Sequence, residues 1–137
     1  MKTVLNLDSP IFTLERLRGA ANDALTRTAK EFKDATKQKM VRGPHTGRLY
    51  RRKRGQSFRR SHRASAPGQR PSPDTGKLLN SVSDKRVGEL THEVSANTPY
   101  APILQDKLDR PIMDEQDARE AEAILQQRYN EKVNQLI

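Results

Sequence analysis

The chain has 137 residues and carries 26 Lys and Arg against 17 Asp and Glu, a formal net charge of +9. Hydrophobic residues make up 33% and aromatic residues 4%, with no Trp and no Cys. This length fits one domain, residues 1–137, with a small core. The lack of cysteine excludes disulfide scaffolds, thiolate zinc sites and cysteine nucleophiles. Because no apolar run is long enough to span a membrane and no signal peptide opens the chain, we expect a soluble, intracellular protein.

The N-terminal segment, residues 10–40, is predicted to form one long helix. Asp8 or Ser9 can cap it, and Pro10 suits the first helical position. The helical pattern ends before Gly43-Pro44. Apolar and small residues recur at helical spacing and predict a face directed at a core: Leu14, Leu17, Ala21, Ala24, Thr28, Phe32 and Ala35.

The positive charge is concentrated in the next segment. Residues 41–73 contain ten Lys and Arg and no acid, whereas residues 1–40 have a net charge of +3, residues 74–110 of −1 and residues 111–137 of −3. Because like charges repel when packed alone, such a block is disordered, lies on a polyanion or is held by a partner.

Within this block, residues 43–73 are predicted to form a basic hairpin and a Pro-rich loop. Residues 47–52 and 57–63 fit two strands with a turn at 54–56, and Tyr50 and Phe58 are the few apolar anchors. Residues 66–73 contain three prolines and a glycine, so we expect an irregular loop there. The hairpin is predicted to be an arm that contacts a partner or DNA through Arg48, Arg51, Arg52, Lys53, Arg54, Arg59, Arg60 and Arg63.

Residues 74–113 are predicted to contain a short helix, two strands and a turn. Residues 74–81 are typical of a helical turn that Asp74 or Thr75 caps. Residues 82–87 and 91–96 predict a half-buried antiparallel pair with valines on both strands. Residues 99–105 are expected to turn back and plug the end of the sheet with Tyr100, Ile103 and Leu104.

The last helix is predicted over residues 114–137. Asp114, Glu115 and Asp117 occupy its first turn, where acids are favourable beside the positive end of the helix dipole. Its apolar stripe is Ala118, Ala121, Leu125, Tyr129, Val133 and Leu136.

The sequence contains no motif for catalysis, metal or cofactor binding. His45, His62 and His92 are far apart, and neither a paired-histidine motif, a Gly-x-Ser-x-Gly nor a phosphate-binding glycine loop is present. Capping and solvation account for the acid clusters around Asp106 and Asp114. We therefore predict no enzyme and no cofactor.

Nucleic-acid binding is the main functional candidate from the residues alone. The eight basic residues of the arm fall within 16 positions, and a ribbon carrying them can lie along phosphates. Tyr50 and Phe58 can stack on bases. The competing interpretation is a solvated or protein-bound loop, and no recognition-helix or RNA-binding signature indicates sequence-specific contact.

Four strings resemble a known family when taken in order. They are GRLY at 47–50, HRASAPG at 62–68, DTGKLLNSV at 74–82 and NTPYAP at 97–102. They are similar to the tail-component family of long-tailed bacteriophages, whose members are called tail-completion, head–tail joining or minor tail proteins. The resemblance covers roughly residues 13–136. The chain departs from the family pattern at Ile103-Leu104-Gln105 and at Ile112, where the family has an aromatic residue.

The resemblance implies an α+β fold, in which a long N-terminal helix and a C-terminal helix pack on a small antiparallel sheet. It also implies a structural role, as a ring around the DNA channel in the neck or upper tail. The positions it assigns to setting the fold are Asp74, Thr75, Gly76, Leu78 and Ser81 around the short helix, Tyr100, Ala101 and Pro102 as the plug, and Arg110 and Pro111 before the last helix.

Together these observations predict a non-enzymatic virion protein, present in the host cytoplasm during assembly. Its expected partners are copies of itself in a ring, neighbouring neck or connector proteins, and tail-terminator or tail-tube proteins, with non-specific contact to DNA in the channel and no membrane. Whether the arm faces DNA or protein stays open. The alternatives are a nucleic-acid-binding protein acting in solution and an assembly chaperone absent from the finished virion.

Overall fold

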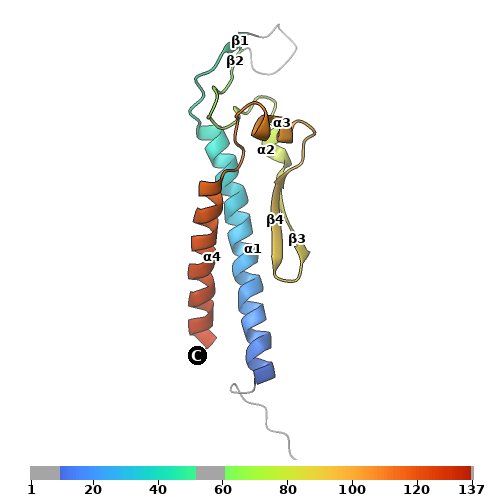
Figure 1. Cartoon of the computed structure of the whole chain (residues 1–137), viewed down its shortest axis with the longest axis vertical. Coiled ribbons are helices and arrows are strands. Elements are labelled where there is room, and N and C mark those ends of the chain that lie inside the picture. Colours follow the sequence, from blue (N-terminus) through green and yellow to red (C-terminus); the bar gives the residue numbers. More distant parts are fainter. Residues whose placement is uncertain (1–9, 52–60, 137) are drawn as a thin grey trace, which may run out of the picture.

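The computed structural model describes residues 10–51 and 61–136 (Figure 1). Along the chain these form α1 (Pro10–Arg42), β1 (Leu49–Arg51), β2 (Ser61–Arg63), α2 (Lys77–Ser81), β3 (Val82–Gly88), β4 (Thr91–Ala96), α3 (Ala101–Asp106) and α4 (Glu115–Leu136). The strands make two separate antiparallel pairs, β1 with β2 and β3 with β4. The predicted α+β class, with its long first helix and closing helix, is confirmed.

The central element is α1, a rod about 50 Å long at 1.5 Å per residue. The α4 helix runs antiparallel along it, and the β3–β4 hairpin lies along it as well (Figure 1). The β1–β2 pair lies at the end where α1 finishes. Thus α1 is the helix that packs on the longer sheet, while α4 packs on α1.

Small side chains let α1 approach both neighbours closely. Its buried residues are Ala20, Ala24, Thr28, Ala29, Thr36 and Met40. The predicted stripe is right at Ala24 and Thr28, but Leu14 is 52% exposed. Because α1 has partners on two sides, its buried surface is wider than a single stripe and is built from alanine and threonine. The buried Thr36 hydroxyl donates to the Phe32 carbonyl at 2.9 Å, which satisfies its polar group within the helix.

The apolar core is small and lies toward the C-terminal end of α1. It consists of Met40, Leu78, Val82, Ala101 and Ile112, which come from α1, α2, β3, α3 and the segment before α4. Ile112 stands where the resembling family has an aromatic residue, and it is buried here.

The β3–β4 hairpin has the predicted strand positions. Val82 pairs with Ala96 and Asp84 with Val94, and a bulge falls between Arg86 and Gly88. Val82 is buried, whereas Val87, inside the bulge, is 49% exposed. A bulge breaks the alternation of faces along a strand, so the apolar pattern of this strand holds only at its first half.

The Tyr-Ala-Pro segment forms a helix instead of the predicted turn. Pro102 falls in the first turn of α3, where a missing N–H costs nothing. The residue that enters the core is Ala101, while Tyr100 and Ile103 are 36% and 45% exposed. The expected plug by Tyr100 and Ile103 is therefore wrong, and Leu104 alone of the three packs against the core.

A buried carboxylate, that of Asp117, joins three distant parts of the chain. Its side chain is 4% exposed and accepts two hydrogen bonds from Arg70, at 2.5 and 3.0 Å, and one from Lys39. Asp114 and Asp117 each accept the other's backbone N–H, at 2.8 and 3.1 Å, which caps the start of α4. Solvation therefore does not account for this acid, contrary to the sequence-based expectation, because Arg70 in the Pro-rich loop covers it.

The cations control the ionisation of this group. Burial by itself raises the pKa of Asp117, but hydrogen bonds from Arg70, Lys39 and the Asp114 backbone outweigh that effect and lower the pKa to about 2. The pKa of Lys39 is raised, chiefly by its hydrogen bond to Asp117.

We predict that this carboxylate makes folding stability depend on acid pH. A fall in pKa from 3.8 to about 2 corresponds to about 2 kcal/mol of stability. Because the pKa is depressed in the folded state, this contribution is complete above about pH 5 and is lost as the pH falls toward 2. Urea denaturation should show this loss in the natural chain and not in Asp117→Asn, which should be about 3 kcal/mol less stable at pH 7.

The matched control is Asp106→Asn, which changes an exposed acid on α3. It should keep the stability and the pH dependence of the natural chain. Identical pH profiles for the natural chain and Asp117→Asn would contradict the assignment.

Candidate interaction site at the basic end

The predicted basic hairpin is present at its base. Leu49 pairs with Arg63, Tyr50 with His62 and Arg51 with Ser61. Two backbone hydrogen bonds extend the pairing toward α1, from Gly47 N–H to the Ala64 carbonyl at 2.8 Å and from Ala64 N–H to the Arg48 carbonyl at 3.0 Å. The predicted turn at 54–56 lies outside the described residues, as do Arg52, Lys53, Arg54, Arg59 and Arg60.

The described part of the arm presents cations beside an aromatic ring. The Arg48 guanidinium lies 5.1 Å from the centroid of the Tyr50 ring, and Arg63 donates to the Gly47 carbonyl at 3.1 Å. Tyr50 is 47% exposed and Leu49 41%. Cation–π contact holds an arginine in place while its donors stay available to an anion. Arg51 belongs to β1.

The hairpin base requires glycine at position 47. A Cβ at Gly47 would lie 2.5 Å from the Ser65 carbonyl oxygen and 2.8 Å from the Ala64 carbonyl oxygen. The two backbone segments can approach this closely only because no side chain separates them.

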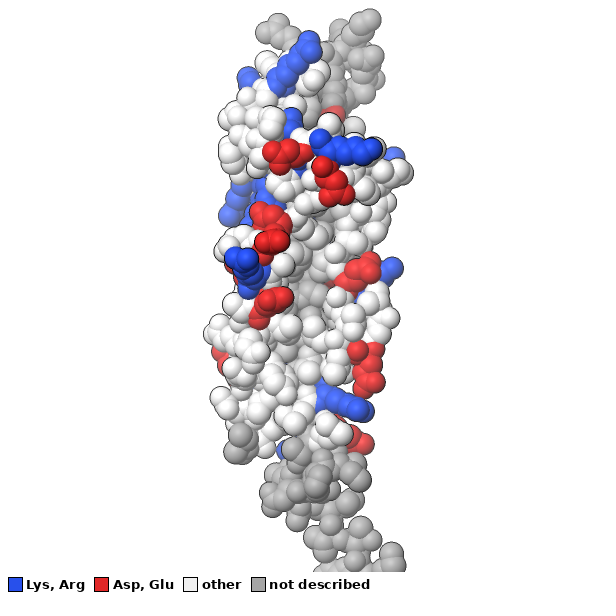
Figure 2. All heavy atoms as spheres, viewed as in Figure 1, with Lys and Arg blue, Asp and Glu red and all other residues white. Residues whose placement is uncertain are grey.

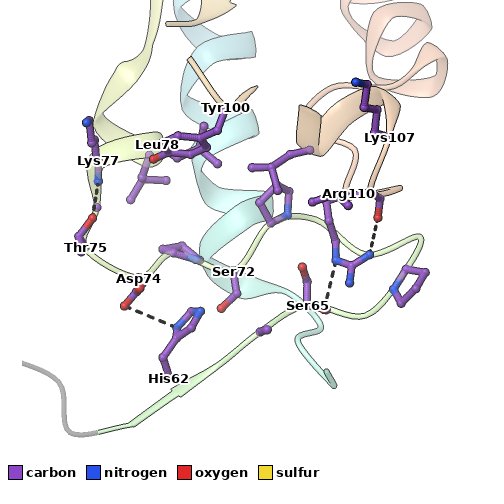
Figure 3. A pocket seen from close by; sticks show the side chains of 18 residues that line it. His62, Ser65, Ser72, Asp74, Thr75, Lys77, Leu78, Tyr100, Lys107 and Arg110 are labelled. Atoms are coloured by element: carbon purple, nitrogen blue, oxygen red, sulfur yellow. Dashed lines mark hydrogen bonds and ion pairs between the residues drawn. The ribbon is translucent and has the colours of Figure 1, made fainter. Parts of the chain in front are cut away.

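A cavity of about 640 Å³ lies between the hairpin base, the Pro-rich loop, α2 and α3 (Figure 3). Its apolar wall is formed by prolines and leucines, namely Pro67, Pro71, Pro73, Leu78, Leu104 and Leu108. Three cations also line it, Lys77, Lys107 and Arg110. The lining thus combines apolar walls with an excess of positive charge, which suits a partner with an apolar side chain and nearby acids.

Polar contacts around the cavity connect the hairpin to the body. His62 Nδ1 lies 3.9 Å from Asp74 Oδ1, so β2 faces the segment before α2 (Figure 3). Arg110 donates to the Ser65 carbonyl at 3.2 Å and to the Leu108 carbonyl at 2.5 Å. These contacts fix the base of the arm relative to α2 and to the segment that leads into α4.

Most positions assigned to setting the fold gather at this end. Asp74, Thr75, Gly76, Leu78, Tyr100 and Arg110 line the cavity. The helix α2 begins at Lys77 and its N-cap is Gly76, with φ of 84° and no side-chain cap, so the predicted cap by Asp74 or Thr75 is wrong. The Thr75 hydroxyl accepts the Lys77 N–H at 3.4 Å in the turn before the helix. Pro111 is half-buried beside Ile112, whereas Pro102 is exposed.

Ser81 has a separate role at the far end of α2. Its hydroxyl donates to the Leu78 carbonyl at 2.7 Å and accepts the Asn97 N–H at 3.3 Å. It therefore joins the end of α2 to the residue after β4.

Sequence reasoning missed the residues that anchor the Pro-rich loop. Arg70 binds Asp117, and the Gln69 amide oxygen accepts the backbone N–H groups of Thr46 and Ala66, at 3.0 and 2.7 Å. The Asp-x-x-Asp spacing at 114 and 117 indicates a helix cap. No pattern in the sequence indicates that Arg70, which lies 47 positions before Asp117, binds the carboxylate of this cap.

The histidines remain at three separate places, His45 after α1, His62 in β2 and His92 in β4. Within residues 10–51 and 61–136, no group of three or more His, Cys, Asp or Glu is arranged to hold a metal ion. None of the helices in this part of the chain is long and apolar enough to cross a membrane.

Comparison of the chain with protein-family models, curated proteins and solved structures finds no match. The resemblance to the phage tail-component family therefore stays a prediction that rests on the strings quoted above.

We predict opposite effects for two Gly→Ala substitutions. Gly47→Ala should lower the free energy of unfolding by about 1–3 kcal/mol, because the added Cβ forces the hairpin base away from residues 64–65. Gly19→Ala, on α1 with nothing within 4 Å of the new Cβ, should raise it by about 0.5–1 kcal/mol, because alanine is the better helix former. Urea denaturation measures both, and equal effects at the two sites would contradict the close approach at Gly47.

Proposed function

We propose that this chain is a non-enzymatic structural protein of a tailed-phage virion. In this proposal it forms a homo-oligomeric ring in the neck or at the head-proximal end of the tail, and it acts in tail completion and head–tail joining around the DNA channel. The family resemblance supports the proposal by its ordered strings. Its partners are further copies of itself, neck or connector proteins, and tail-terminator or tail-tube proteins.

The observation that carries the proposal is the separation of the molecule into a body and a basic end. The body is the α1, α4 and β3–β4 assembly, and the end holds the β1–β2 hairpin and the cavity beside it (Figure 1). Arg48, Tyr50 and Arg63 are exposed there. An elongated body suits side-by-side packing in a ring, and a ring then presents one basic end per subunit.

Repetition around a ring turns weak contacts into strong ones. One hairpin offers a few exposed charges, whose pairs with a partner are each worth about 0–1 kcal/mol at a surface. Several identical hairpins acting together raise the overall affinity through effective concentration. This gain in affinity applies in both cases, whether the hairpins contact an acidic protein ring or line the channel and contact DNA phosphates.

The deciding experiment is electron microscopy of lysates from a phage or induced prophage that lacks the gene. We expect filled heads and free tails to accumulate separately, because the joining component is missing. Complementation with the intact gene is the control and should restore joined particles. Normal infectious particles without the gene would refute the proposal, and absence of the protein from purified particles would favour an assembly chaperone.

A nucleic-acid-binding protein acting in solution is the second candidate, favoured by the block of ten cations without an acid and by the Arg48–Tyr50 contact. Such a protein binds duplex DNA tightly and loses affinity steeply as salt rises. A virion component is expected to bind free DNA weakly and to copurify with particles.

We predict how arm variants separate these two functions. If DNA is the ligand, Arg48→Glu with Arg63→Glu should lower the slope of log affinity against log salt by about 2, because about two phosphate contacts are lost. Under the virion proposal the same variant should impair particle joining with little change in the already weak DNA binding. Lys85→Glu, on the exposed part of β3, is the matched control and should change neither measurement.

A further inference from the structure

The cavity beside the hairpin base has an exposed apolar rim. Tyr100 and Leu108 line it and are 36% and 51% exposed, and Ile103, one helical turn after Tyr100, is 45% exposed. We call these three side chains the α3 rim. They lie outside the core, whereas Ala101 and Leu104 of the same segment contact it. Large apolar side chains that are exposed together beside a cavity are typical of a binding surface.

The mouth of the cavity carries positive charge that the chain itself does not neutralise. Figure 3 shows Lys77 at one side of the cavity and Lys107 and Arg110 at the other. Both lysines are exposed, and neither has an ion-pair partner within the described part of the chain. Arg110 donates to two backbone carbonyls and to no described carboxylate. Asp74 is the one acid among the described lining residues, so an acidic ligand finds cations on both sides.

The cavity is preformed, because its walls are bonded to each other. Three prolines fix the backbone of the Pro-rich loop on one side. The Gly68 N–H donates to the Asp109 carbonyl at 2.7 Å, and Arg110 donates to the Ser65 carbonyl at 3.2 Å. These hydrogen bonds join the loop to the segment after α3. A site that does not need to rearrange binds its ligand at a low cost in conformational entropy.

The size and lining of the cavity favour a protein ligand over a nucleic acid. Its volume of about 640 Å³ suits a large apolar side chain together with part of the backbone that carries it. A phosphate backbone offers no apolar group to walls of proline and leucine. Tyr100 is the only Phe, Tyr or Trp among the described lining residues, so successive bases find no stacking platform.

We propose that this cavity binds an extended acidic segment of a partner protein. One large apolar side chain of the segment inserts between the prolines and the α3 rim, and its carboxylates lie beside Lys77 and Lys107. The proposal deepens the proposed function, on which it rests only for the identity of the partner. The binding test uses the isolated full chain and the test of virion function uses particles, so the failure of one is distinguishable from the failure of the other.

The probes are labelled, capped heptapeptides with three acidic residues on each side of one central residue, which is Leu, Phe or Ser. Fluorescence anisotropy measures their affinity. The Leu or Phe peptide should bind about 10-fold more tightly than the Ser peptide, because burial of a large apolar side chain is worth at least about that factor. Equal affinities would overturn the proposal, because a net charge of +9 attracts any acidic peptide.

Leu108→Ser tests the apolar rim. It should weaken binding of the Leu and Phe peptides about 5-fold and leave binding of the Ser peptide unchanged, because it removes apolar contact area from the mouth. The matched control is Leu14→Ser, which replaces a leucine of similar exposure, 52%, near the opposite end of α1. It should change no affinity. Equal losses in the two variants would contradict the site.

Lys107→Glu tests the charge at the mouth. It should weaken binding of every acidic peptide about 5-fold, whereas Lys30→Glu, the same charge change at an exposed position of α1, should have a much smaller effect because salt screens distant charges. Duplex and single-stranded oligonucleotides serve as competitors. An oligonucleotide that displaces the Leu peptide and itself binds Leu108→Ser more weakly would assign the cavity to nucleic acid and overturn the proposal.

Discussion

The buried carboxylate of Asp117 is the contact on which the arrangement of this small protein depends. Its side chain lies at the start of α4 and binds Arg70 of the Pro-rich loop and Lys39 near the end of α1. An isolated buried charge would cost several kcal/mol, so the three segments must meet for any of them to be satisfied. Hydrophobic residues make up only 33% of the chain, so burial of apolar surface contributes little to holding these three segments together.

The same contact determines where the basic end can lie. Arg70 belongs to the loop that follows β2, and Gln69 next to it holds that loop against Thr46 before β1. The hairpin base is thereby attached to the core end of α1 and to α4. The cavity beneath it follows from this attachment, because the prolines of the loop form a wall that does not collapse onto α2 and α3. In the proposed ring, a firmly held base with exposed arginines is what a repeated docking element requires.

The cationic end determines what kind of partner it can bind. The end offers arginines and lysines around an apolar cavity, which suits an acidic surface or a phosphate backbone.

The sequence by itself determined most of the elements: both long helices, the β3–β4 strands and the base of the basic hairpin follow from periodicity, capping residues and charge, which act over neighbouring positions. It also determined where the positive charge lies. Only the tertiary structure decided which polar groups are buried, that Ala101 and not Tyr100 enters the core, and that Arg70 reaches Asp117. Those outcomes depend on contacts between residues tens of positions apart. The local pattern that predicts a helix or strand does not change with the distant side chain that packs on that element, so it carries no information about those contacts.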